Sequence, residues 1–319
     1  MRLVPLLLLT ACVDADAPVH AGDEAPLIVE VPAGSSASRL TDTLEAQGLV
    51  PAGWQWRWFL RSADAGCVKA GRHELRRSMS MREVLAALCG APIPEDEPFT
   101  VVEGWRIRDI DEALAAKGWI KAGEYVALAE SKAVTAPFEV PGPTLEGYLF
   151  PDTYRVEPKK LTARGFIERQ LTTFQERFLA THADLGGRSL RDVVIVASLV
   201  EREEPTKDNR PIVAGVMWKR LDAGWNLGID ASSRYVLPDW NDRAAFLARL
   251  RDPDDPYNTR LRGGLPPTPI GNPGIESLEA AAKPKETEFW YYLHDAQGVL
   301  HGGKSAAEHE ANRAKYNVY

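Results

Sequence analysis

Residues 189–201 have the sequence SLRDVVIVASLVE, and this stretch decides the fold of the larger part of the chain. Ser189 followed by Asp192 three residues later is typical of a capping box, which begins a helix. Residues 193–200 are apolar or small on nearly every face of that helix. A helix without a polar face is buried, so it belongs inside a domain. We therefore predict a buried helix that ends beside Glu201.

Glu201 follows this apolar stretch and is the residue that we expect to do chemistry. Ala197 and Ser198 precede it by four and three residues, so one helical face runs from the apolar core to a single carboxylate. Partial burial disfavours the charged form of a carboxyl group, as a general acid near neutral pH requires. Glu203 and Glu204 lie elsewhere around the helix, and we expect them to be solvated. The alternative is that these glutamates form an ordinary charged helix end.

Two further segments differ from ordinary loops. Residues 145–154 have the sequence LEGYLFPDTY and place carboxylates among aromatic side chains. Residues 257–270 begin with a tyrosine–asparagine pair and contain several prolines. Prolines reduce the freedom of the unfolded chain and here indicate a rigid wall. The alternative for each segment is a packed loop with hydrogen-bonded carboxylates.

The composition excludes several classes of protein. The 319 residues are enough for about two domains. The net charge is −7 and no basic block is present, so we expect no nucleic acid partner. The sequence has no nucleophile elbow, phosphate loop or histidine-based triad, and it has no C-x-x-C pair. We therefore expect neither a cofactor nor a metal site.

The first twelve residues, MRLVPLLLLTAC, resemble a bacterial lipoprotein signal. Their apolar run is too short to span about 30 Å of hydrocarbon as a helix. One positive charge, a short apolar stretch and small residues before a cleavage site are typical of an export signal. We predict a signal peptide over residues 1–11, lipidation of Cys12 and a flexible tether over residues 12–26. The alternative is a buried N-terminal strand with a chance cysteine.

Cys67 and Cys89 are the remaining cysteines. An exported chain meets an oxidising compartment, where the two can form a disulfide. Such a bond would close a loop of roughly two dozen residues and stabilise the fold by ~3 kcal/mol. Two buried free thiols are the alternative.

The predicted fold class is α+β, with a small module followed by a larger domain. The acidic, proline-containing stretch from Ile93 to Pro98 is the first boundary. Residues 27–92 form the small module before it. We expect residues 93–165 to form a connecting region that lines the functional site, and residues 166–319 to form the larger, catalytic domain.

The order of these segments resembles the endolytic murein transglycosylases, the YceG-like or MltG family. The resemblance covers roughly residues 28–316 and includes several ordered motifs: residues 145–154, 197–203, 213–216, 257–259, 264–267 and 272–274. It implies a catalytic domain of the YceG-like type with mixed α/β structure. It also implies that residues 27–92 are a LysM-like module, a kind of module that binds N-acetylglucosamine polymers.

The resemblance places the catalytic glutamate of the family on Glu201. It implies cleavage of the bond between N-acetylmuramic acid (MurNAc) and N-acetylglucosamine (GlcNAc) in nascent peptidoglycan strands. The product carries a 1,6-anhydroMurNAc end, and elongation of the strand terminates. Five further residues are candidates for orienting the sugar or the catalytic group: Glu146, Asp230, Tyr257, Asn258 and Pro266.

The expected partners are peptidoglycan glycan strands, peptidoglycan synthases and, through the lipid anchor, a membrane. The expected location is the cell envelope, with the catalytic domain on the periplasmic or extracytoplasmic side. One alternative is a muramidase that uses Glu201 and Asp230 as a hydrolytic pair. The other is a peptidoglycan-binding lipoprotein without catalysis.

Overall fold

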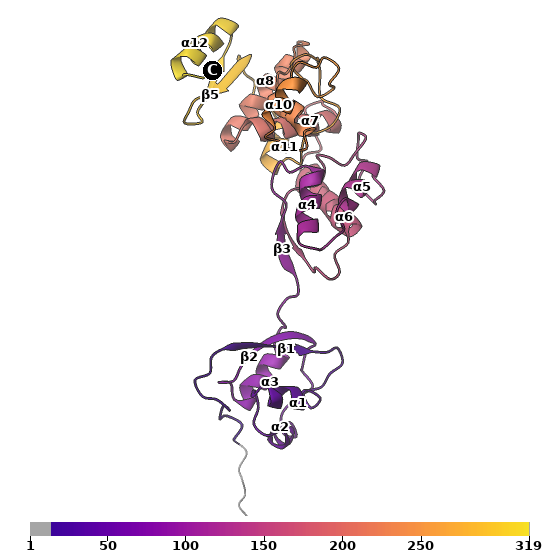
Figure 1. The fold of residues 1–319 in the computed structure, drawn as a ribbon, viewed down its shortest axis with the longest axis vertical. Coiled ribbons are helices and arrows are strands. Elements are labelled where there is room, and N and C mark those ends of the chain that lie inside the picture. Colours follow the sequence, from indigo (N-terminus) through magenta and orange to yellow (C-terminus); the bar gives the residue numbers. More distant parts are fainter. Residues whose placement is uncertain (1–13, 319) are drawn as a thin grey trace, which may run out of the picture. The chain divides into compact units, whose positions relative to one another are not determined.

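The chain divides into two compact units (Figure 1). In the computed structural model residues 14–318 are described, and the division falls after Glu97, inside the Ile93–Pro98 stretch expected as the first boundary. The signal peptide expected at residues 1–11 and the lipidation expected at Cys12 lie outside the described residues.

The N-terminal unit combines an antiparallel strand pair with short helices. Its elements are β1 (Pro26–Val31), α1 (Thr41–Ala46), α2 (Gly53–Phe59), β2 (Gly71–Arg76) and α3 (Met81–Cys89). β1 pairs with β2 so that Val29 lies opposite His73. Val29, Trp56 and Leu88 are among the buried side chains that form its hydrophobic core. This core gives the small unit a packed interior of its own.

Residues 14–25 belong to the segment expected as a tether over residues 12–26, and several of them contact this unit. The carbonyl oxygen of Ala15 accepts a hydrogen bond from the N–H of Arg82 at 3.3 Å. Asp16 forms an ion pair with the guanidinium of the same arginine at 2.9 Å. These partners lie more than sixty residues away in the chain, so composition alone does not reveal them.

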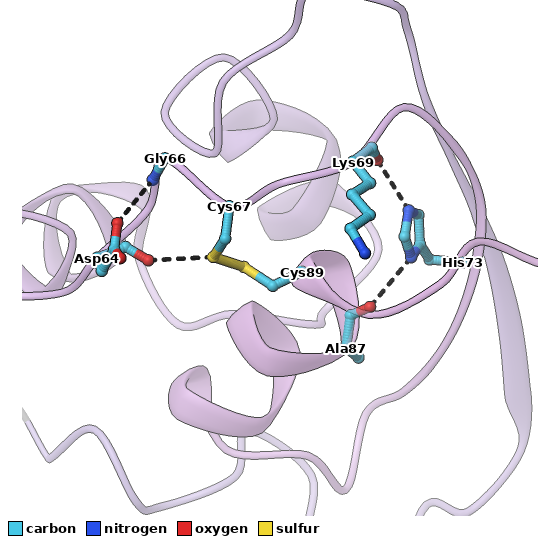
Figure 2. The surroundings of a disulfide bond; sticks show 7 residues. All are labelled: Asp64, Gly66, Cys67, Lys69, His73, Ala87 and Cys89. Atoms are coloured by element: carbon cyan, nitrogen blue, oxygen red, sulfur yellow. Dashed lines mark hydrogen bonds between the residues drawn. A yellow bond between two sulfur atoms is a disulfide. The ribbon is translucent and has the colours of Figure 1, made fainter.

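Cys67 and Cys89 are joined in a disulfide (Figure 2). Their Cα atoms are 5.0 Å apart, and the bond ties the segment before β2 to the last residue of α3. The buried ring of His73 lies nearby, with its two nitrogens 2.9 and 3.0 Å from the carbonyl oxygens of Lys69 and Ala87. The disulfide and the histidine therefore connect the same segment to the same helix.

The C-terminal unit is mostly helical. Its strands are β3 (Glu97–Thr100), β4 (Thr153–Val156), β5 (Tyr291–His294) and β6 (Leu300–Gly303). β3 pairs with β4, and β5 pairs with β6. The first helices are α4 (Ile107–Ala116), α5 (Glu124–Ser131), α6 (Ala163–Phe174), η1 (Gln175–Leu179) and α7 (Leu190–Glu203). The later helices are η2 (Lys207–Asn209), α8 (Arg210–Asp222), α9 (Asp230–Tyr235), α10 (Arg243–Arg249), α11 (Ile275–Ala282) and α12 (Ala306–Tyr316).

α7 is the central helix of this unit. The side chain of Ser189 accepts a hydrogen bond from the N–H of Asp192 at 3.1 Å, as expected for its first turn. Residues 193–200 are all buried, and α7 packs against α8 and α11. The prediction of a buried helix is therefore confirmed.

One hydrophobic core extends through the C-terminal unit and joins side chains as distant in sequence as Phe99, Tyr148 and Val196. The part of the expected connecting region from residue 98 to residue 165 therefore belongs to the same packed body as residues 166–319. Within residues 14–318, no helix has both the length and the apolar character needed to cross a membrane.

Candidate active site

Glu201 lies in the last turn of α7, and its side chain is only 6% exposed. Its two carboxylate oxygens accept hydrogen bonds from the guanidinium of Arg210 at 2.8 and 3.2 Å. The N–H of Gly274, at the beginning of α11, donates to the same carboxylate at 2.9 Å. The N-terminus of a helix favours a negative group, and hydrogen bonds from a guanidinium to a carboxylate are strong. The two Arg210 donors and the N–H of Gly274 therefore hold the carboxylate in one orientation.

Arg210 is the partner that sequence analysis missed. Its own side chain is 5% exposed, and its Nε donates to the carbonyl oxygen of Glu204 at 3.1 Å. The pairing follows from the short connection between α7 and α8, which returns the first residue of α8 to the end of α7. A buried ion pair costs desolvation, and the paired hydrogen bonds offset that cost.

A turn at Glu103 and Gly104 packs against Glu201. Gly104 has a φ of 78°, which favours glycine, and an added Cβ there would lie 3.4 Å from Cγ of Glu201. An added Cβ on Gly274 would collide with the carboxyl group of Glu103. Gly274 therefore contacts both glutamates, one through its N–H and the other through its Cα. Sequence analysis did not select Glu103, because nothing in its own segment indicates this contact.

The charges around this turn differ in sign. Partial burial is the main cause that raises the pKa of Glu103, and the negative charges of Glu201 and Glu276 raise it further. The positive charges of Lys207 and Arg210 lower it. Glu276 forms an ion pair with Lys207 at the start of α11. The site therefore contains three carboxyl groups and two cations within electrostatic range of one another.

Arg202 connects this turn to a neighbouring cavity of about 550 Å³. Its Nη2 donates to the carbonyl oxygen of Gly104 at 2.6 Å, and its guanidinium lies over the ring of Trp240 at 4.4 Å. The cavity is lined by Trp105, Arg106, Asp109, Glu112, Ala113, Arg202 and Trp240. A polar group held next to aromatic walls is typical of a ligand site. The cavity adjoins Glu201 through its neighbour in sequence rather than being lined by Glu201 itself.

Comparison with known proteins shows the family to which the chain belongs. The model of the YceG-like family matches residues 29–315. The chain belongs to the YceG-like family. A YceG-like protein of Listeria monocytogenes with a solved structure is 25% identical, with a TM-score of 0.59. That comparison covers 90% of this chain and 99% of the Listeria protein.

Two relatives of this YceG-like chain are named endolytic murein transglycosylase. The Bacillus subtilis protein is 25% identical over 316 residues, which cover 94% of this chain and 87% of the relative. The Streptococcus pneumoniae protein is 24% identical over 334 residues, covering 95% of this chain. The chain spans 60% of the length of the Streptococcus protein.

Glu146 is buried in this YceG-like fold and supports the loop that leads to Gly274. Its carboxyl oxygens accept hydrogen bonds from the N–H of Ile107 at 3.2 Å and from the hydroxyl of Tyr235 at 3.0 Å. The side-chain amide of Asn272 donates to it at 3.1 Å. Burial raises the pKa of Glu146 to about 7. With 1% of its surface exposed, Glu146 lies inside the fold, where it holds Asn272 and the loop that leads to Gly274.

Asn258 is also fully buried. Its side-chain amide donates to the carbonyl oxygens of Arg249, Leu250 and Asp252 at 3.0, 3.2 and 3.0 Å. Pro266 is buried as well. The structure thus places both residues in the packing of the loop, where they shape its path.

Tyr257 and Asp230 are more accessible. The hydroxyl of Tyr257 is 2.8 Å from the hydroxyl of Thr268. Asp230 is the first residue of α9, its side chain is 41% exposed, and it forms an ion pair with Arg260 at 2.6 Å. Glu201 and Asp230 are therefore held by different cations, Arg210 and Arg260.

The expectation that Glu203 and Glu204 are solvated is wrong. Glu204 is fully buried and lies 2.8 Å from Nε2 of His294. Glu203 accepts a hydrogen bond from the hydroxyl of Tyr292 at 3.3 Å, and burial raises the pKa of Glu203. The reason is that β5, about ninety residues later in the chain, covers this end of α7. Among residues 14–318, no group of three or more His, Cys, Asp or Glu side chains could hold a metal ion.

Proposed function

We propose that the chain is an endolytic lytic transglycosylase that cleaves nascent peptidoglycan between MurNAc and GlcNAc. The cleavage leaves a 1,6-anhydroMurNAc end and terminates elongation of the strand. The observation that carries the proposal is the enclosed Glu201 carboxylate, fixed by Arg210 and Gly274 at the position where the resemblance places the catalytic glutamate. Relatives named endolytic murein transglycosylase support the same class of activity.

The chemistry requires a proton donor and a proton acceptor at one bond. In the simplest mechanism Glu201 protonates the glycosidic oxygen while the C–O bond breaks, and the 2-acetamido oxygen of MurNAc supports the positive charge at the anomeric carbon. The Glu201 carboxylate then accepts the proton of the muramic acid 6-hydroxyl, whose oxygen bonds to the anomeric carbon. Water is not consumed. Arg210 and the N–H of Gly274 hold the carboxyl group of Glu201 in one place for both steps.

The decisive experiment is mass spectrometry of glycan strands digested by the purified protein. A transglycosylase yields anhydro ends, whereas a muramidase that pairs Glu201 with Asp230 yields reducing ends. Glu201→Gln should lower turnover at least ~100-fold, as expected for loss of a general acid or base. Asp230→Asn is the matched control, because it also removes one carboxylate without changing the shape of the side chain. Reducing ends, or equal residual turnover in wild type and Glu201→Gln, would contradict the proposal.

The remaining parts of the proposal concern the first hundred residues. We propose that residues 27–92 are a LysM-like module that guides glycan strands to the catalytic unit. Trp54 and Trp58 support this role, because they lie one turn apart on α2 with 56% and 53% of their surfaces exposed. Such exposed aromatic side chains are typical of interaction sites. Loss of strand binding by the full chain after Trp54→Ala/Trp58→Ala would support the module's role, and unchanged binding would contradict it.

We further propose that lipidation of Cys12 anchors the chain to a membrane, with the catalytic unit in the extracytoplasmic cell envelope beside peptidoglycan synthases. The disulfide between Cys67 and Cys89 is consistent with an oxidising compartment. Incorporation of a radiolabelled fatty acid into wild type and its absence in Cys12→Ser would support the anchor. Wild-type protein without label would contradict it.

A further inference from the structure

Arg202 brings a positive charge to the cavity beside Glu201, and its guanidinium is held from two sides. Its Nη2 donates to the carbonyl oxygen of Gly104 at 2.6 Å, and its Cζ lies 4.4 Å from the centre of the Trp240 ring. Its Nε is buried and has no hydrogen-bond partner within residues 14–318. Leaving a buried donor without an acceptor costs free energy. The guanidinium therefore has donor capacity that this part of the chain does not use.

The carboxylates around Arg202 are engaged by other cations. Arg106 binds both carboxylate oxygens of Asp109 at 2.7 to 3.2 Å, and Arg210 pairs with Glu201 at 2.8 Å. In the described part of the chain, no ion pair includes Arg202. Burial lowers the pKa of Arg202, although the negative charges of Asp109 and Glu201 act in the opposite direction. An additional negative group in the cavity would therefore be stabilised.

A second arginine of the same unit has the neutral arrangement that Arg202 lacks. Arg188 lies over the ring of Trp218 at 4.4 Å and lines a different cavity, of about 660 Å³. Its guanidinium donates to the two carboxylate oxygens of Asp222 at 2.6 and 2.7 Å, and this contact raises the pKa of Arg188. Arg202 has the same aromatic support without the carboxylate, which leaves that part for a ligand to supply.

The position of the cavity decides which part of a substrate can enter it. Arg202 follows Glu201 on α7, and successive side chains of a helix point about 100° apart. The cavity is lined by Arg202 and not by Glu201, so it lies to the side of the reacting bond. A sugar ring bound at Glu201 would place a branch of the strand there. In peptidoglycan the branch is on MurNAc, whose lactyl group and stem peptide carry carboxylates.

We infer that this cavity is a subsite for the substituent of MurNAc, in which Arg202 binds a carboxylate between walls formed by Trp105 and Trp240. The inference names a feature of the substrate and rests on the proposed function. A guanidinium forms strong, paired hydrogen bonds with a carboxylate. The cavity volume of about 550 Å³ is within the range of ligand sites. The subsite selects strands whose MurNAc residues carry an anionic group.

The test compares two forms of one substrate, using the full chain. The first form is purified glycan strands that retain their stem peptides, and the second is the same strands with their carboxyl groups converted to amides. KM should be at least ~10-fold lower on the anionic strands, as expected for a hydrogen bond between charged groups. The two values of kcat should differ less than about threefold, because a contact away from the reacting bond is the same in the ground state and the transition state.

Substitution of Arg202 should remove this preference. Arg202→Gln should raise KM on the anionic strands to the value for the amidated strands and leave turnover of the amidated strands as in wild type. Arg202→Lys keeps the charge without the planar fork, so it should retain part of the preference. Arg188→Gln is the matched control and should keep the full preference, because Arg188 already pairs with Asp222. A merely structural role of Arg202 would instead lower activity equally on both forms.

A third substrate distinguishes the two sources of the carboxylate. Strands from which an amidase has removed the stem peptides keep only the lactyl carboxylate. If wild type still prefers them over their amidated form and Arg202→Gln does not, the lactyl carboxylate is the bound group. If that preference is absent, the bound carboxylate belongs to the stem peptide.

Binding provides a measurement that does not depend on turnover. In a chain that carries Glu201→Gln, calorimetric titration with the anionic strands should show at least ~10-fold weaker binding after Arg202→Gln is added. Equal KM values of wild type on the two forms, or equal losses on both in Arg202→Gln, would overturn the inference alone. Reducing ends, or equal residual turnover in wild type and Glu201→Gln, would instead overturn the proposed function.

Discussion

The two units of the chain hold their folds in different ways. The N-terminal unit encloses a small core and adds a covalent bond between Cys67 and Cys89. The C-terminal unit has a much larger core and buries charged groups inside it, including the Glu201–Arg210 pair and Glu146. Small domains gain from cross-links because their cores are limited, whereas buried charges cost stability and are found where chemistry needs them. The comparison indicates that a cross-link supports the small core of the first unit, whereas the large core of the second unit tolerates the cost of buried charged groups.

The largest expected effect comes from breaking the buried ion pair. Arg210→Met leaves the Glu201 carboxylate buried without its cation, so the C-terminal unit should lose about 3–5 kcal/mol of unfolding free energy. Urea unfolding of the full chain measures this. The transition of the N-terminal unit is identified by its sensitivity to reductant and should not move. Adding Glu201→Gln to Arg210→Met should restore part of the loss, and a further loss would contradict the pairing.

The next largest effect is expected from removing the disulfide of the N-terminal unit. Replacing both Cys67 and Cys89 with serine should lower the stability of the N-terminal unit by ~3 kcal/mol, because the bond closes a loop with a sequence separation of 22. The transition of the C-terminal unit should stay unchanged. If both transitions shifted equally, the two units would not unfold independently, and the comparison would need revision.

The raised pKa of Glu146 makes the unfolding free energy of the C-terminal unit depend on pH. Its pKa is about 7 in the fold, above the ordinary value of 4.5, so the folded state binds the proton more tightly than the unfolded state. Its contribution is therefore most favourable below pH 4.5 and is lost as the pH rises toward 7, by up to ~3 kcal/mol. Unfolding free energies measured across this range should show the slope in wild type. Glu146→Gln should remove that slope, and an unchanged slope would contradict the assignment.

The smallest expected change in stability is at the surface of α2. Trp54→Ala/Trp58→Ala should change the unfolding free energy of the N-terminal unit by less than about 1 kcal/mol, because both side chains are exposed. Trp56→Ala provides the contrast, because its fully buried side chain should cost about 3–5 kcal/mol. Urea unfolding distinguishes the two cases.

Sequence analysis predicted the features that depend on local pattern. The burial of the apolar stretch of α7 was predicted from residues adjacent in the chain and is confirmed, and Glu201 at its end is buried as well. Arg210 was missed because only the return of the chain into α8 brings it to Glu201. Glu103 was missed because its turn reaches the site through backbone hydrogen bonds with the distant loop at Asn272. Glu204 was placed wrongly because β5 covers it, and no pattern in α7 reveals a strand that follows much later.

The glycine at position 274 has a consequence for how the site can change. Because its N–H is one of the three donors to the Glu201 carboxylate, any movement of its loop alters the support of that group. A displacement of about 1 Å can cost ~100-fold in rate. The backbone at position 274 therefore controls the setting of Glu201 without any change in the acidic side chain itself.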